Sequence, residues 1–202
     1  MAHPLSRPRH TLRRDERGIS IVEFALISPV FLTLLMGVFD IGHQLYARSV
    51  LEGEMRRAGR SSTLETAVTA RQDQLDEDVR SQVLRVAGQG ATVDFTRKAY
   101  LTYQAAQAKA EPFIDANNDG LCDNGESFDD WNGNGRRDLD GARTGQGNAR
   151  DAVVYTARLR YPRLFPMAGL VGWSNDVVIE ASTVLRNQPY GDQAAVALGK
   201  CL

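Results

Sequence analysis

The fold is decided by the stretch Gly18-Ile-Ser-Ile-Val-Glu-Phe-Ala-Leu-Ile-Ser-Pro-Val-Phe-Leu-Thr-Leu-Leu-Met-Gly-Val-Phe39. The 21 residues that follow Gly18 are mostly Ile, Val, Leu and Phe. A helix of that length rises about 32 Å, which is enough to cross a hydrocarbon core of ~30 Å. We therefore predict a membrane-spanning helix over residues 19–40, in which Pro29 removes one backbone hydrogen bond.

Glu23 is the only ionisable side chain between Arg17 and Asp40. One turn inside the membrane, a carboxylate costs about 1–3 kcal/mol, depending on its depth. Two explanations are open. The side chain extends back to the interface, as long polar side chains do, or it has a partner within the membrane.

The charge before the helix predicts the topology of the chain. Residues 1–17 carry five arginines against Asp15 and Glu16. Basic residues directly before an apolar helix favour a cytoplasmic N-terminus, so the rest of the chain is expected outside. The apolar run is longer than a secretory signal and lacks a small-residue cleavage site after it. A basic tail could instead contact nucleic acid. The apolar helix directly behind it favours a role in orienting the chain in the membrane, so no nucleic-acid partner is expected.

Beyond the membrane segment about 160 residues remain, enough for one domain with its own core. The only two cysteines, Cys122 and Cys201, both fall in this part. An oxidising exterior would let them pair, but the sequence gives no geometry and leaves the disulfide open.

The pattern after Asp40 predicts two helices. The first continues amphipathically to Arg60 and is expected to break at Gly59 and residues 61–63. A second helix, capped by Ser62 or Thr63 with Glu65 in its first turn, is expected to end at Gly88. Its apolar residues recur at spacings of three, four and seven and form one face: Leu64, Val68, Leu75, Val79, Val83 and Val86.

Three segments alternate between apolar and polar residues and predict strands: 92–103, 153–161 and 177–186. One polar face is typical of an antiparallel sheet that a helix covers on the other side. The expected fold is therefore α+β, with a domain over residues 41–190 and a polar C-terminal tail over 191–202.

The opening segment resembles a known family. A basic leader ending in Arg17-Gly18, followed by Val22-Glu23-Phe24-Ala25-Leu26 and Pro29, is similar to TadE/TadG-like proteins. These are minor pilins or pseudopilins of bacterial tight-adherence (Flp) type IV pili. The resemblance covers residues 17–60 well and the last strands, up to Pro189-Tyr190, loosely.

The resemblance implies how the helix is processed and assembled. A prepilin peptidase would cut after Gly18, which makes residues 1–18 a leader and Ile19 the new N-terminus. Glu23 and Phe24 would then serve assembly, because the Glu23 carboxylate of one subunit can neutralise the terminal amine of another where screening is weak. The implied location is the bacterial inner membrane or the pilus itself, with lipid, other pilin subunits and the assembly machinery as partners.

An acidic insert over residues 113–141 departs from any minimal pilin. It holds an imperfect fifteen-residue repeat, and its first copy has the spacing of a calcium loop. Alternating oxygen ligands wrapped around a hard cation by Gly120 suit Ca²⁺ rather than a transition metal. The predicted ligands are Asp115, Asn117, Asp119, the Leu121 carbonyl, Asp123 and Glu126.

The second copy is weaker, because its twelfth position is Gly141 and Asp140 is left as a substitute. Its other predicted ligands are Asp130, Asn132, Asn134, the Arg136 carbonyl and Asp138. One or two calcium ions are thus expected. The alternative is a solvated loop whose Asn and Asp side chains form Asx-turns.

No catalytic residues are predicted. All three histidines precede residue 44, so the exterior domain has none for a nucleophile pair or a zinc site. We expect a structural or assembly component rather than an enzyme. The alternative is a single-pass, calcium-dependent surface-binding or adhesion protein in which the helix is only an anchor.

Overall fold

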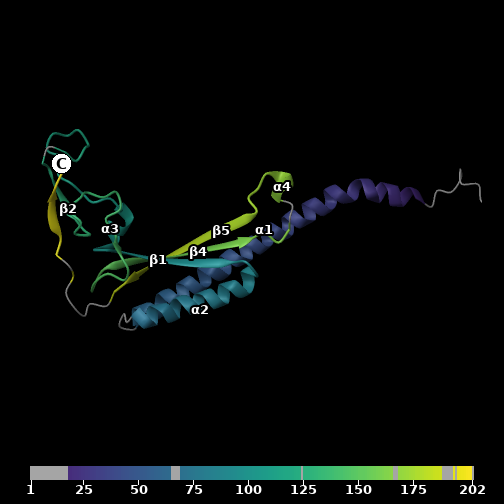
Figure 1. Ribbon diagram of the computed structural model, residues 1–202, viewed down its shortest axis with the longest axis horizontal. Coiled ribbons are helices and arrows are strands. Elements are labelled where there is room, and N and C mark those ends of the chain that lie inside the picture. Colours follow the sequence, from purple (N-terminus) through teal and green to yellow (C-terminus); the bar gives the residue numbers. More distant parts are fainter. Residues whose placement is uncertain are drawn as a thin grey trace, which may run out of the picture.

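The computed structural model describes residues 18–64, 69–123, 125–165, 168–187, 193 and 195–201. The expected leader, apart from Gly18, and Glu65, expected in the first turn of the second helix, lie outside these ranges. The expected caps Ser62 and Thr63 lie inside the first helix, which ends at Leu64, so neither begins the second helix. The chain folds as an α+β head carried on one long helix (Figure 1).

Helix α1 runs without a break from Ile19 to Leu64, 46 residues with Pro29 inside. The predicted break at Gly59 is therefore wrong. A Cβ on Gly59 would lie 3.2 Å from side-chain atoms of Thr183 and Leu185. The glycine lets the helix approach the sheet closely, so its role is in packing rather than in ending the helix.

Helix α2, Thr69–Ala87, packs beside the second half of α1. Leu75, Val79 and Val83 are buried on its inner face, as their spacing predicts. Gly88 follows the last helical residue with a φ of 80°, and its N–H donates to the Leu84 carbonyl at 3.0 Å. This is a glycine C-cap at the expected place.

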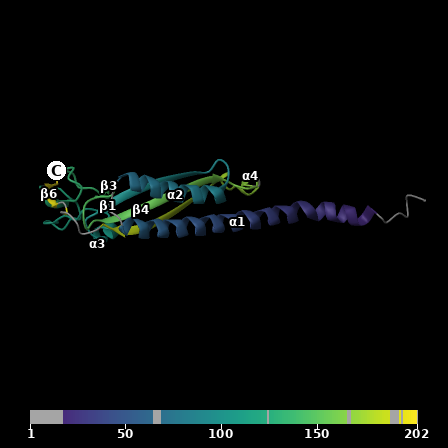
Figure 2. The ribbon, with the colours of Figure 1, turned by 90° about the horizontal axis from the view of Figure 1, so that it is seen from below.

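The main sheet has the strand order β3-β1-β4-β5, and every neighbouring pair is antiparallel. The bounds are β1 Thr92–Tyr100, β3 Arg143–Thr144, β4 Ala152–Pro162 and β5 Asp176–Arg186. Alternate residues of β4 and β5 are buried under α1 and α2, and the other face stays polar and open (Figure 2). The predicted one-sided antiparallel sheet is confirmed.

Two predicted boundaries differ from the structure. The first strand ends at Tyr100, and Tyr103 begins the short helix α3, Tyr103–Ala108. The Thr102 side chain caps this helix by accepting the Ala105 N–H at 3.1 Å. The alternation that continued to Tyr103 was therefore misleading, because a threonine in an extended conformation is also a good N-cap.

The expected C-terminal tail is partly a strand. Residues Ala197–Lys200 form β6, which pairs antiparallel with β2, Ser127–Asp130, in a separate two-stranded sheet. This sheet, α3 and the acidic insert gather at one end of the head (Figure 1). At the opposite end, the β4–β5 connection with the short helix α4, Ala168–Val171, lies beside α1.

Candidate functional site

The bare half of α1, residues 19–39, extends beyond the head (Figures 1 and 2), and none of its most apolar window is buried. Every Ile, Val, Leu and Phe from residue 19 to residue 39 is exposed. The helix is long and apolar enough to cross a membrane. An apolar surface of this extent requires lipid or another protein to cover it.

Glu23 lies on this bare part of the helix and is itself exposed. Among the described residues, its carboxylate has no hydrogen-bond or ion-pair partner. Gly18 at the start of the helix is also exposed, and a Cβ placed there would meet nothing within 4 Å. The predicted processing and assembly residues Gly18, Ile19, Glu23 and Phe24 are therefore all accessible from outside.

A buried ion pair joins the helix to the head where the apolar stretch ends. Asp40 is 2% exposed and pairs with Arg163 at the end of β4; its other oxygen accepts the Leu164 N–H at 3.3 Å. Tyr161 lies close by, and burial, together with the Asp40 charge, raises the pKa of its hydroxyl. The junction between the exposed apolar part of α1 and the head is thus a specific polar contact.

The first acidic loop is closed by hydrogen bonds to its own backbone. The Asp115 carboxylate accepts the N–H groups of Asp119 and Gly120 at 3.2 and 2.9 Å. Asp119 accepts the Leu121 N–H at 2.8 Å, and Glu126 accepts the Ala116 N–H at 2.6 Å. The side chains at the first and twelfth positions of the predicted loop therefore both accept hydrogen bonds from its own backbone.

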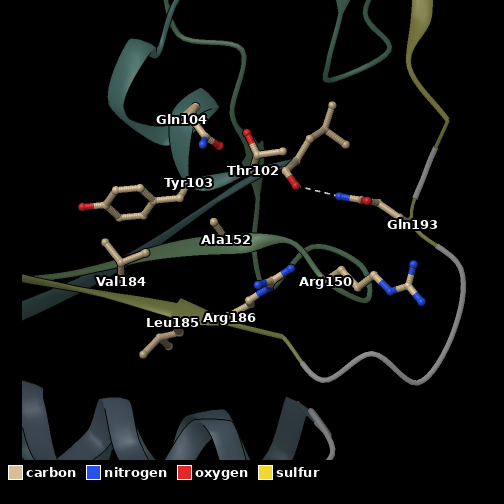
Figure 3. Close-up of a pocket in the computed structure, with 10 residues that line it drawn as sticks. Thr102, Tyr103, Gln104, Arg150, Ala152, Val184, Leu185, Arg186 and Gln193 are labelled. Atoms are coloured by element: carbon tan, nitrogen blue, oxygen red, sulfur yellow. Dashed lines mark hydrogen bonds between the residues drawn. The ribbon is translucent and has the colours of Figure 1, made fainter.

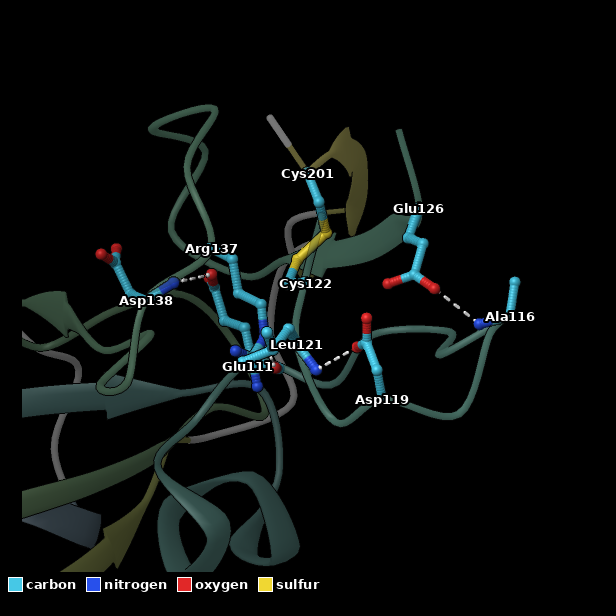
Figure 4. The surroundings of a disulfide bond; sticks show 9 residues. All are labelled: Glu111, Ala116, Asp119, Leu121, Cys122, Glu126, Arg137, Asp138 and Cys201. Carbon is cyan, nitrogen blue, oxygen red and sulfur yellow. Dashed lines mark hydrogen bonds between the residues drawn. A yellow bond between two sulfur atoms is a disulfide. The ribbon is translucent and has the colours of Figure 1, made fainter. Parts of the chain in front are cut away.

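Glu126 leaves one oxygen without a partner. The residue is 9% exposed, its Oε2 is buried, and no described group donates to that oxygen. Figure 4 shows the free oxygen on the side of the carboxylate that faces Asp119. A buried carboxylate oxygen without a donor is costly unless a cation or water reaches it.

In the described residues, no three Asp, Glu, His or Cys side chains are grouped closely enough to hold a metal ion. Amide nitrogens take positions beside the carboxylates instead. Asn117 Nδ2 donates to Asp119 at 2.7 Å, and the Nδ2 atoms of Asn132 and Asn134 donate to Asp138 at 2.8 and 2.6 Å. The Oδ1 atoms of these three amides accept the N–H groups of Asp119, Asn134 and Arg136, so the side chains form the Asx-turns of the alternative explanation. The residue types also fit Ca²⁺.

The second loop repeats the pattern with one exchange. Asp130 accepts the N–H groups of Gly133, Asn134 and Gly135, as Asp115 does in the first loop. The twelfth-position contact comes from Glu111, which is fully buried. Its carboxylate accepts the N–H groups of Trp131 at 2.7 Å and Asp138 at 2.8 Å.

Asp140, the substitute expected from the sequence, is directed elsewhere. It accepts from Lys98 Nζ at 2.5 Å and from the Tyr100 hydroxyl at 2.8 Å, both on β1. Burial alone would raise the pKa of Asp140, but these hydrogen bonds and the Lys98 charge lower it below its ordinary value. Asp140 attaches the insert to the sheet, and sequence reasoning missed Glu111 because it precedes the repeat.

Cys122 and Cys201 form a disulfide across 79 residues, with their Cα atoms 5.3 Å apart (Figure 4). The bond lies between the first acidic loop and the end of β6. Backbone hydrogen bonds flank it, from Gly125 N to the Cys201 carbonyl at 3.1 Å and from Cys201 N to the Glu126 carbonyl at 2.8 Å. The disulfide therefore fixes the C-terminal strand to the loop that holds Glu126.

A cavity of about 520 Å³ lies where β1, β4 and β5 meet α3 (Figure 3). Arg150 and Arg186 line it, and Gln193 Nε2 donates to the Leu101 carbonyl at 2.6 Å beside it. It contains none of the residues predicted to serve processing, assembly or metal binding, so we assign it no chemistry.

Comparison with known proteins bears on the helix. The family described as TadE-like protein matches residues 18–60. This part of the chain is similar to that family, and we refer to it as the TadE-like segment. It spans the bare half of α1 and most of the half that packs on the head, about one fifth of the chain. Neither the curated proteins nor the solved structures gave a match.

Proposed function

We propose that this chain is a minor pilin or pseudopilin, a structural or assembly component of a bacterial tight-adherence pilus. The observation that carries the proposal is the bare apolar half of α1 with the unpartnered Glu23 near its start. A helix that only anchored a protein would need no carboxylate there, because an acid within the membrane costs free energy. The TadE-like segment supports the same assignment.

The processing step of the proposal concerns Gly18. A prepilin peptidase cuts after this residue, and Ile19 becomes the N-terminus of a single-pass inner-membrane protein whose head lies outside the cytoplasm. Mass spectrometry of the membrane-extracted protein tests this step. An N-terminus at Ile19 is expected; an intact leader would instead favour the membrane-anchored adhesion protein.

The assembly step concerns Glu23. Its carboxylate neutralises the new terminal amine of a neighbouring subunit, a pairing that gains strength in a medium of low dielectric constant. Glu23→Gln keeps the size and removes the charge, so membrane insertion and processing should persist while incorporation into pili falls. Glu52→Gln, in the exposed Glu52–Arg48 pair on the same helix, is the matched control. Normal pili in the Glu23→Gln strain would remove this residue from assembly.

We further propose that the first acidic loop binds one Ca²⁺ as a structural ion. The buried, unpartnered Oε2 of Glu126 supports this assignment, since a cation at the loop centre would satisfy it. Asp115, Asn117, Asp119 and Glu126 would supply side-chain oxygens, and the bound charge would offset their mutual repulsion. Extracellular loops of this kind bind with a Kd of about 10⁻⁴–10⁻³ M. The second loop is a weaker candidate, because Glu111 already bonds two backbone N–H groups there.

Calorimetric titration of the full chain in detergent micelles with CaCl₂ tests the metal proposal. A saturable heat is expected in the wild type and in Glu180→Gln, an exposed carboxylate on the open face of the sheet. The heat should disappear in Glu126→Gln. Absence of saturable heat in the wild type would overturn the calcium assignment and leave the pilin proposal untouched.

A further inference from the structure

The connection between β4 and β5 has an unusual composition for the surface of this domain. No ionisable side chain lies between Arg163 and Asp176, although charged residues make up 24% of the chain. Leu164 and Trp173 within it are 51% and 43% exposed. Surface loops normally carry polar side chains, so an apolar one indicates a non-aqueous contact.

The same connection is attached to α1 at a defined position along the helix, residue Asp40. Asp40 accepts the Leu164 N–H and pairs with Arg163. Arg163 in turn donates to the Ser174 carbonyl at 2.8 Å, and its guanidinium lies over the Trp173 ring at 5.0 Å. Leu164 and Trp173 are therefore fixed, through one arginine, to the helix residue at which the apolar stretch ends.

That position is the edge of the bilayer if residues 19–39 span it, since 21 residues rise about 32 Å. The α4 end of the head is also the end nearest the bare half of the helix (Figures 1 and 2). Tryptophan concentrates at this level in membrane proteins, because its ring is apolar and its N–H is polar.

We propose that Leu164 and Trp173 insert into the lipid headgroup region and form a second membrane contact that orients the head. The binding partner of these two side chains is the lipid surface of the same bilayer that would surround α1. One helix alone lets the head rotate and tilt, whereas a second contact beside it removes these motions. This inference rests on the proposed membrane insertion of α1 and is independent of processing and pilus assembly.

The chain offers a matched pair of probes, because Trp131 and Trp173 are its only tryptophans. Trp131 follows β2 and Trp173 comes shortly after α4, and these two elements lie at opposite ends of the head (Figure 1). Trp131→Phe leaves Trp173 as the sole emitter and keeps the backbone N–H that Glu111 accepts. Trp173→Phe leaves only Trp131. Both full-length variants are placed in phosphatidylcholine nanodiscs that carry a quencher at the headgroup or at the acyl-chain centre.

We expect the headgroup quencher to reduce Trp173 emission by about twofold or more and the acyl-chain quencher to act less, as for interfacial tryptophans. Trp131 should respond only to acrylamide in the water. Trp173 emission that acrylamide quenches and the lipid quenchers do not would overturn the proposal. Trp173 protected from both would also overturn it and indicate a protein contact. Failure of the chain to co-elute with nanodiscs would instead refute the insertion of α1.

Discussion

The Glu111 side chain occupies the space that a side chain on Gly141 would fill. A Cβ on Gly141 would lie 2.5 Å from Glu111 Cγ and 2.8 Å from its Oε1. Gly141 is the twelfth residue of the second acidic loop, where the repeat of the first loop calls for a glutamate. The missing carboxylate is thus provided from outside the loop, and the glycine is required to admit it.

Glu111→Gln should destabilise the insert by about 1–3 kcal/mol, because one of two buried backbone donors would face an amide N–H₂ instead of an oxygen. Gly141→Ala should act in the same direction by displacing Glu111. Hydrogen exchange at the Trp131 and Asp138 amides measures both effects. Asp94→Asn, exposed on the open face of the sheet, is the control. Unchanged protection at both amides would contradict this role for Glu111.

Asp40→Ala should lower the free energy of unfolding by about 2–4 kcal/mol, since it leaves the partly buried Arg163 without its carboxylate and the Leu164 N–H without an acceptor. The exposed pair of Arg158 and Glu180 is the matched comparison, and Glu180→Ala should cost less than about 1 kcal/mol. Chemical denaturation of the full chain in micelles measures both. Equal effects of the two substitutions would show that the junction pair has no special role.

The double variant Cys122→Ser/Cys201→Ser should release β6 while the core of α1, α2 and the main sheet stays folded. Closing a loop of this length stabilises by about 4 kcal/mol in chain-entropy terms, and a two-stranded sheet alone is marginal. Hydrogen exchange should show lost protection at Gly125 and Cys201, and reduction of the wild type should reproduce it. Retained protection of these amides would mean that the β2–β6 pairing is stable without the disulfide.

Stability should fall above pH 10 because of Tyr155. Burial, and then its hydrogen bond to Asp76, raise the pKa of this hydroxyl above the ordinary 10.0. The folded state therefore holds the proton more tightly than the unfolded state. The resulting stabilisation is complete below pH 10 and is lost as the pH rises towards the folded pKa. In denaturant titrations from neutral pH to about pH 11, Tyr155→Phe should show a shallower loss; equal slopes would argue against it.

Local patterns predicted much of this fold because the relevant forces act within a few residues. Ala157, Leu159 and Tyr161 alternate with Thr156, Arg158 and Arg160, and the first three are buried as the pattern requires. Gly88 likewise ends α2 through its own backbone conformation. Such features can be predicted without knowing which distant residues pack against them.

Features that depend on distant partners could not be read from the sequence. Thr183 and Leu185 lie so close to Gly59 that the glycine serves packing, and the local sequence does not show this approach. Strand β6 forms only beside β2 and the disulfide, and its short sequence carries no alternation of its own. For the same reason the spacing within the acidic repeat located Asp115 and Glu126, whereas Glu111 became visible only when the chain was folded.

The uninterrupted course of α1 has a mechanical consequence. Neighbouring subunits would hold the N-terminal end of α1. The C-terminal part of the same continuous helix packs along β5 and α2. A pull along its axis would be borne in shear by the whole packed length and by the pair of Asp40 and Arg163, with no hinge between them to yield first.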